Sequence, residues 1–322
     1  MARLVVLRDP LVRLHGLGDP RARLPGFDRM ELGAYAIMLA AGTLLAWASR
    51  DHPTAMPLWA PWDFSWAVFV PTGLAGWWYA RGLVRTAGGW RPSRTRQAGF
   101  WLGLGAIYAM LQTHYEYAAL HLFALNRFQH LALHHLGPFL IALAWPGPTL
   151  ARGMPAVLRR AIGARAVRGV LDRVQRPVLA GVLFVGLLYL WLIPVVHLRA
   201  MLDPTLYAVM NASMVIDGIL FWTLAIDLRP SPPARLSYSV RMLLALGVQV
   251  PQIVLGGFIC FAGRDLYPFY SLCGRIIGIT PLLDQQIGGF IVWFPAGMMS
   301  AIAFMMLLHA MATDETRQLA RG

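Results

Sequence analysis

The chain has 322 residues and a formal net charge of +13, yet only 13% of its residues are charged and 57% are hydrophobic. Soluble domains carry about 25% charged residues, so this composition cannot supply an ordinary water-exposed surface. The mean hydropathy is +0.55, and the apolar residues fall in blocks of about 17–24, which is the length that crosses a hydrocarbon core. The composition therefore excludes a soluble protein and indicates an integral membrane protein.

Apolar spans follow one another along the chain and are separated by Pro- and Arg-rich segments. We expect eight spans, at residues 32–48, 64–80, 98–113, 127–146, 178–197, 206–226, 241–262 and 286–309. The third span is short, so seven crossings are the alternative. The sequence predicts an all-α fold, a polytopic transmembrane helical bundle. Its parts are a basic arm (1–30), a membrane domain (31–310) and a short tail (311–322).

The basic residues are all arginines, and they are distributed unevenly between the two sides of this topology. If the N-terminus is cytoplasmic, 23 of the 28 arginines fall on the inner side, in residues 1–30, 81–96, 147–177, 227–241 and after 310. Because cytoplasmic loops are enriched in Arg and Lys, this asymmetry predicts that both termini are cytoplasmic. This enrichment of arginine in the inner segments accounts for the positive net charge. The expected partner is therefore the lipid bilayer and not a nucleic acid.

Most histidines fall at or near the outer ends of the spans, and they are densest in and before the fourth span. His130 and His134 are four residues apart, so on an α-helix they share a face and can ligate one metal ion, with His114 and His121 as further candidates. Leu131 stands where the HExxH zinc-protease motif needs a glutamate, which excludes that motif. Copper is the preferred metal, because imidazole and nearby thioethers suit it. The alternative is a set of histidines that only form hydrogen bonds between helices.

Asp217 lies near the middle of the sixth span. An ionisable side chain at that depth costs about 2.5–3.5 kcal/mol on insertion scales. We therefore expect Asp217 to face the interior of the bundle and to have a polar partner. Its role is either a satisfied hydrogen bond between helices or a proton-relay or ligand contact.

Polar and aromatic residues gather around the start of the last span. Asp284 is placed to cap the N-terminus of that span, with Gln285 and Gln286 following it, while Trp293 lies further along the same span and Tyr267 lies in the preceding loop. These residues indicate that the start of the last span packs closely against its neighbours. They are candidate functional residues, although their chemistry alone names no function.

Four strings of residues together resemble a known family. They are Gln129-His130-x-x-Leu133, Gly218-Ile-Leu-Phe-Trp222, Leu266-Tyr-Pro-x-Tyr270 and Asp284-Gln-Gln-x-Gly-Gly-x-x-x-Trp-x-Pro295. Over roughly residues 95–310 the chain resembles the CtaG-type assembly factors of bacterial cytochrome c oxidases of the caa type. The resemblance implies a protein of the bacterial cytoplasmic (inner) membrane that helps to build a haem–copper oxidase. It also implies oxidase subunits as partners, copper as the ion handled, and an assembly role rather than an enzymatic one.

The chain departs from the family pattern at three positions where that pattern has histidine, namely Asn126, Leu192 and Asn211. His130 is the family histidine that is retained. Two other functions stay open on the residues alone. A membrane transporter or channel would use Asp217, but it would be expected to show two related halves, which the sequence lacks. A metal-dependent membrane oxidoreductase would use the outer histidines.

Overall fold

The computed structural model describes residues 29–85, 91–272 and 274–320. These residues form helices joined by turns, and no strand occurs within the three ranges. The all-α prediction is therefore confirmed. The basic arm predicted for residues 1–30 lies, up to residue 28, outside the described residues.

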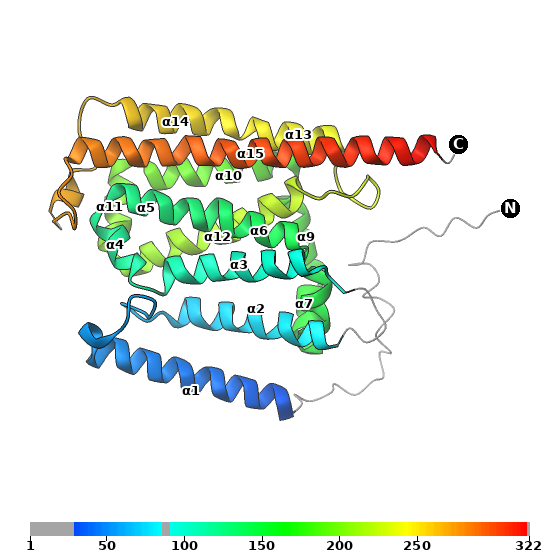
Figure 1. Ribbon diagram of the computed structural model, residues 1–322, viewed down its shortest axis with the longest axis horizontal. Coiled ribbons are helices and arrows are strands. Elements are labelled where there is room, and N and C mark those ends of the chain that lie inside the picture. Colours follow the sequence, from blue (N-terminus) through cyan, green and yellow to red (C-terminus); the bar gives the residue numbers. More distant parts are fainter. Residues whose placement is uncertain (1–28, 86–90, 273, 321–322) are drawn as a thin grey trace.

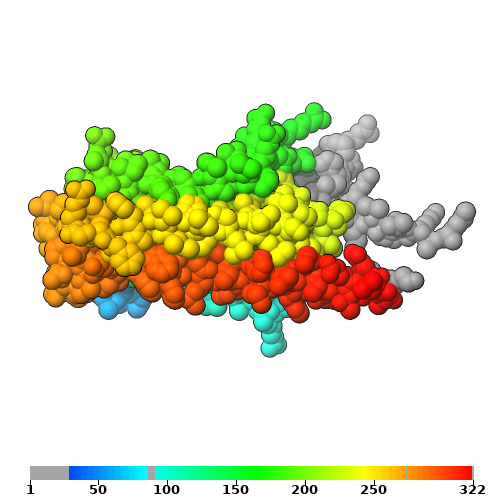
Figure 2. All heavy atoms as spheres, turned by 90° about the horizontal axis from the view of Figure 1, so that it is seen from above, coloured from blue at the N-terminus to red at the C-terminus, as the bar shows by residue number. Residues whose placement is uncertain are grey.

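The long helices lie side by side with roughly parallel axes (Figure 1). Single helices form six of these rods: α1 (Arg29–Asp51), α2 (Trp66–Val84), α3 (Arg94–Leu111), α10 (Pro177–Leu192), α12 (Pro204–Ala225) and α15 (Pro281–Leu319). Consecutive helices form two more: α5 (Phe123–His130), a π-helix (Leu131–Leu136) and α6 (Gly137–Ala144), and then α13 (Tyr238–Gly247) and α14 (Gln249–Phe261). Each predicted span overlaps one of these rods. In the view of Figure 2, α13, α14 and α15 run along one long side of the molecule.

Short helices cover the two ends of the bundle. One end, here called the α4 end, holds the 3₁₀ turns Pro53–Ala55 and Pro268–Ser271 with α4 (Tyr115–His121) and α11 (Pro194–Leu202). The other, here called the α7 end, holds α7 (Gly147–Gly153), α8 (Ala156–Ile162) and α9 (Arg165–Val174) (Figure 1). The predicted outer segments lie at the α4 end, and the Arg-rich segments 147–177 and 227–241 lie at the α7 end.

Fewer helices than expected are long and apolar enough to cross a membrane on their own. Within the described ranges they are α1, α12, the α13–α14 rod and α15, with a fifth span if α9 and α10, which meet at 74°, count as one. The prediction of eight spans is therefore supported only in part. The shortfall has physical reasons, because α10 has only 16 residues and the π-helix divides the α5–α6 rod.

Two boundaries differ from the predicted ones. The third span is short, as predicted, because α3 ends at Leu111 and α4 is a separate helix. The fifth ends at Leu192, before Pro194, which opens α11. The last helix has 39 residues, about 58 Å at 1.5 Å per residue. It runs to Leu319 and so takes up most of the predicted tail 311–322, projecting past α13 (Figure 1).

Candidate functional site

Basic side chains lie inside the bundle along α5 and the π-helix. Arg127 and His130 are each 2% exposed, His134 is fully buried and His135 is 4% exposed. Charged or titratable groups are rarely buried in this way unless they are paired or functional. This row of basic groups, together with the residues that contact it, is the candidate site.

The π-helix lets α12 approach the row closely. A wide turn leaves backbone carbonyls without their usual partners, and the His134 carbonyl accepts a hydrogen bond from Trp222 Nε1 at 3.2 Å. One turn earlier on α12, a Cβ built on Gly218 would lie 2.5 Å from the same carbonyl oxygen. Gly218 and Trp222 therefore seat α12 against the π-helix, which explains the Gly-x-x-x-Trp spacing of that string.

Asp217 has a buried partner. Its Oδ2 lies 3.1 Å from His134 Nε2, and both side chains are buried. A carboxylate only accepts, so Nε2 donates in this bond, and Nδ1 is the second nitrogen of the ring. The described residues give that Nδ1 no hydrogen-bond partner. The prediction that Asp217 faces the interior with a polar partner is confirmed.

His130 faces a small cavity. Both of its ring nitrogens are buried and, in the part of the chain that the structure describes, neither has a hydrogen-bond partner. The cavity has a volume of about 10 Å³, close to what one water molecule needs. Its lining consists of Arg127, His130, Leu131, His134, His135, Leu188, Ile291 and Val292. The π-helix thus keeps His130 and His134 at one cavity, as the i, i+4 spacing predicted for a regular helix.

Arg127 supplies a buried positive charge beside this cavity. Its Nη2 donates to Asn126 Oδ1, and its guanidinium lies 5.2 Å from the centre of the Phe123 ring. Its Nε and Nη1 have no hydrogen-bond partner among the described residues. Asn126, one of the positions where the family pattern has histidine, also donates from Nδ2 to Met201 Sδ at 3.8 Å. The amide of Asn126 thus binds Arg127, at a position where the family pattern has an imidazole.

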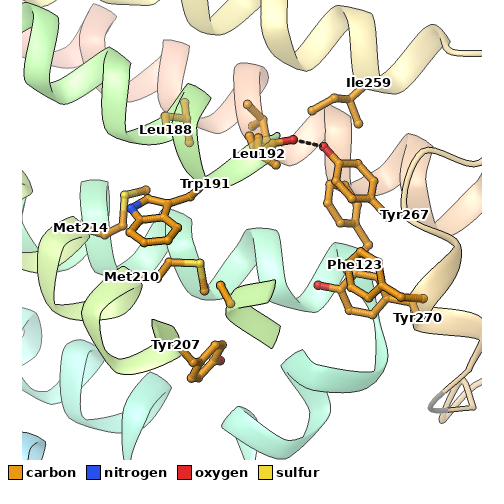
Figure 3. Close-up of a cluster of buried hydrophobic side chains, with 13 residues drawn as sticks. Phe123, Leu188, Trp191, Leu192, Tyr207, Met210, Met214, Ile259, Tyr267 and Tyr270 are labelled. Carbon is orange, nitrogen blue, oxygen red and sulfur yellow. Dashed lines mark hydrogen bonds between the residues drawn. The ribbon is translucent and has the colours of Figure 1, made fainter. Parts of the chain in front are cut away.

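The Leu266–Tyr270 segment packs against Phe123 at the start of α5, where Tyr267 and Tyr270 lie beside that ring (Figure 3). Tyr267 stacks on Phe123 at 4.2 Å and donates to the Leu192 carbonyl at 2.8 Å. Burial raises the pKa of Tyr267 to about 12, so its hydroxyl stays protonated as a donor. Tyr270 donates to His197 Nε2 at 2.9 Å, and His197 Nδ1 donates to the Trp191 carbonyl at 3.0 Å. His197 is therefore fully satisfied, unlike His130.

Asp284 caps α5 rather than its own helix, which corrects the prediction. Its Oδ2 and Oδ1 accept from the backbone N–H groups of Phe123 at 3.0 Å and Ala124 at 2.9 Å. Thr280 instead caps α15, because its Oγ1 accepts from the N–H of Leu283 at 3.2 Å. The carboxylate of α15 therefore fixes the start of the helix that carries the basic row.

The other residues predicted around the last span have structural contacts. Gln285 Oε1 accepts from the N–H of Leu266 at 2.6 Å, and its Nε2 donates to the carbonyls of Ile259 and Arg264. Gln286 is half-buried. A Cβ built on Gly256 of α14 would lie 2.8 Å from Trp293, so the glycine makes room for that indole. Gln285 and Trp293 thus join α15 to the loop and to α14 rather than to the basic row.

His114 and His121 lie apart from His130 and His134. His114 Nδ1 donates to the Ala60 carbonyl at 3.1 Å, and His121 Nδ1 donates to the Tyr117 carbonyl at 2.8 Å. Neither lines the small cavity. Within residues 29–85, 91–272 and 274–320, no group of three or more His, Cys, Asp or Glu side chains is arranged to hold a metal ion. The structure does not assemble the four candidate histidines into one centre.

Sequence reasoning missed several members of the site. Arg127 was counted only as an outer charge, although an arginine inside a predicted span was itself a signal of burial. The pairing of His130 with His134 assigns no role to His135, although His135 is buried in the same row. Tyr270 stood within a family string but received no role, and its bond to His197 depends on a loop contact that no local pattern indicates.

Comparison with known proteins identifies a family. A family model described as the cytochrome c oxidase caa3 assembly factor, Caa3_CtaG, matches residues 77–314, well over half of the chain. No curated protein and no solved structure matches this chain.

Proposed function

The chain belongs to the cytochrome c oxidase caa3 assembly factor family, and from this membership we propose that it handles copper during assembly of a haem–copper oxidase. In this proposal it crosses the bacterial inner membrane eight times with both termini cytoplasmic. It contacts the oxidase subunits that receive the ion and holds Cu(I) as cargo between His130 and His134.

The state of His134 is the observation that carries the copper proposal. Metal-binding histidines almost always donate their second ring N–H to a carboxylate or carbonyl, which fixes the ring and the tautomer. His134 is held in this way by Asp217, and its remaining nitrogen has no hydrogen-bond partner in the described part of the chain. His130 adds an imidazole with both nitrogens unpaired at the same small cavity.

The charges around the cavity fit a monovalent cargo better than a resident divalent ion. Asp217 supplies one negative charge behind His134, while Arg127 places a positive charge on the lining. A second cation in a low-dielectric interior is costly unless an anion offsets it. Two imidazoles without a third ligand hold the ion loosely, which suits a site that must release it to a partner.

Copper retention by purified variants tests the proposal. The double variant His130→Ala with His134→Ala should lose the copper that the wild-type protein keeps after loading with Cu(I) and desalting. The matched control is His114→Ala with His121→Ala, which also removes two histidines and should keep wild-type copper. Elution volume and helical circular dichroism establish that each variant is folded. Equal copper in the two double variants would refute the assignment.

Reporter fusions test the proposed orientation. Because 23 of the 28 arginines fall on one side, fusions in segments 81–96 and 147–177 should report a cytoplasmic location. A periplasmic signal from either segment would overturn the orientation and would also move the histidines of the α4 end to the cytoplasmic side.

A further inference from the structure

A second, much larger cavity lies between the helices toward the α7 end. Its volume is about 720 Å³, within the range of about 300–1,000 Å³ that is typical of small-molecule sites. No residue that lines it also lines the small cavity at His130. Its apolar walls come from α2, α3, α6 and α12 and include Ala75, Leu104, Ile107, Ile141, Val215 and Ile219. The body of this cavity is therefore suited to a hydrocarbon chain.

The end of the same cavity is strongly basic. The lining contributed by the described residues includes one carboxylate, Asp227, and five arginines: Arg152, Arg159, Arg229, Arg235 and Arg241. Asp227 accepts two hydrogen bonds from the Arg229 side chain, at 2.8 and 2.7 Å, and a third from the Arg229 backbone N–H at 3.1 Å. The exposed Asp172 pairs with Arg235 at 2.5 Å. Among the described lining residues, the guanidinium groups outnumber the carboxylates. An apolar chamber with a positive end favours an anionic amphiphile.

Arg241 is the lining residue that most directly favours an anionic ligand. Its side chain is fully buried, with Nη2 donating to the Arg229 carbonyl at 2.9 Å and Nε donating to the Ser237 carbonyl at 3.3 Å. Its Nη1 is buried and has no acceptor among the described residues. A buried charged donor without an acceptor is unfavourable, and an anionic oxygen in the cavity would satisfy it.

Trp145 brings an aromatic ring to the same basic end of the cavity. It lines the cavity and is the C-cap of α6, where its φ of 51° ends the helix in the left-handed conformation. The Arg229 guanidinium lies 4.1 Å from the centre of the Trp145 ring, so the indole helps to position one of the basic groups.

We propose that this cavity binds an anionic lipid. The apolar chain lies between α2, α3, α6 and α12, and the anionic head group lies against Arg241 and its neighbouring arginines. Basic pockets between transmembrane helices recognise anionic head groups through the same combination of charge and apolar contact. The head group is supplied either by a phospholipid phosphate or by a fatty-acid carboxylate, which share this chemistry. The site is separate from the proposed copper site and does not depend on it.

Native mass spectrometry of the full chain in detergent tests the proposal. Delipidated protein is mixed with phosphatidylglycerol, with phosphatidylcholine of the same acyl chains, or with oleate. We expect one tightly bound phosphatidylglycerol and at least tenfold weaker retention of phosphatidylcholine. Oleate bound in place of phosphatidylglycerol would support the site with a fatty acid as its source. Equal retention of the anionic and the zwitterionic lipid would overturn the proposal.

Variants locate the bound lipid. Arg241→Gln should weaken phosphatidylglycerol binding at least tenfold, whereas Arg160→Gln, at an exposed arginine outside the lining, should leave it unchanged. Ile219→Trp fills the apolar body without changing charge and should also exclude the lipid, so the proposal stays testable if Arg241→Gln fails to fold. Binding that survives Ile219→Trp, or that falls equally in Arg160→Gln, would show that the lipid sits elsewhere.

Discussion

Replacing Asp284 with alanine should strongly destabilise the bundle, because this one carboxylate of α15 caps another helix. Asp284 is fully buried and accepts from two backbone N–H groups at the start of α5. Its removal leaves both donors unpaired, at about 1–3 kcal/mol for each buried group. The expected loss is therefore about 2–6 kcal/mol. Asp284→Asn keeps an acceptor oxygen and should fall between the wild type and Asp284→Ala.

The matched control is Asp203→Ala, which removes another aspartate that caps a helix. Asp203 Oδ1 accepts from the N–H groups of Thr205 at 2.8 Å and Leu206 at 3.2 Å, but Asp203 is exposed, so water can replace it. A cap of this kind contributes about 0.5–2 kcal/mol. Apparent Tm in detergent, followed by tryptophan fluorescence, should fall clearly further for Asp284→Ala. An equal or larger fall for Asp203→Ala would refute the reasoning from burial.

Two further predictions concern titratable groups. Asp217→Leu leaves His134 Nε2–H without its acceptor and should cost about 1–3 kcal/mol, whereas Asp217→Asn should retain most of the stability. Equal apparent Tm for these two variants would contradict that pairing. Burial, with a smaller effect of the Asp63 charge, raises the pKa of Glu116 from 4.5 to about 8. The folded state thus binds the extra proton, so stability should fall as pH rises from about 4.5 to about 8 and level off above it. Glu116→Gln should flatten this part of the curve of apparent Tm against pH, and an unchanged slope would count against the shift.

The order of the helices could be predicted from sequence because apolar blocks and Arg-rich connections are local properties of the chain. The depth and pairing of Asp217 followed from the cost of a buried carboxylate, although its partner His134 did not. The role of Asp284 was misplaced because local reasoning assigns a cap to the helix that follows it. The actual contact joins Asp284 to Ala124, 160 residues away in sequence. The wide turn at Leu131–Leu136 escaped prediction as well, because its six residues fit a regular helix equally well.

That wide turn changes how the fourth rod can tolerate insertion and deletion. A π-turn holds about one residue more than an α-turn, so the wide turn accommodates one extra residue while α5 packs on α15 and α6 packs on α3 and α12. Deleting one residue between Leu131 and Leu136 would therefore restore a continuous α-helix with little rotation of α6 relative to α5. Gly137, whose added Cβ would lie 2.9 Å from Ile107 of α3, would still face that helix. The α5–α6 rod should thus tolerate a single-residue deletion in this turn, whereas a deletion within α5 or α6 would turn one packed face by about 100°.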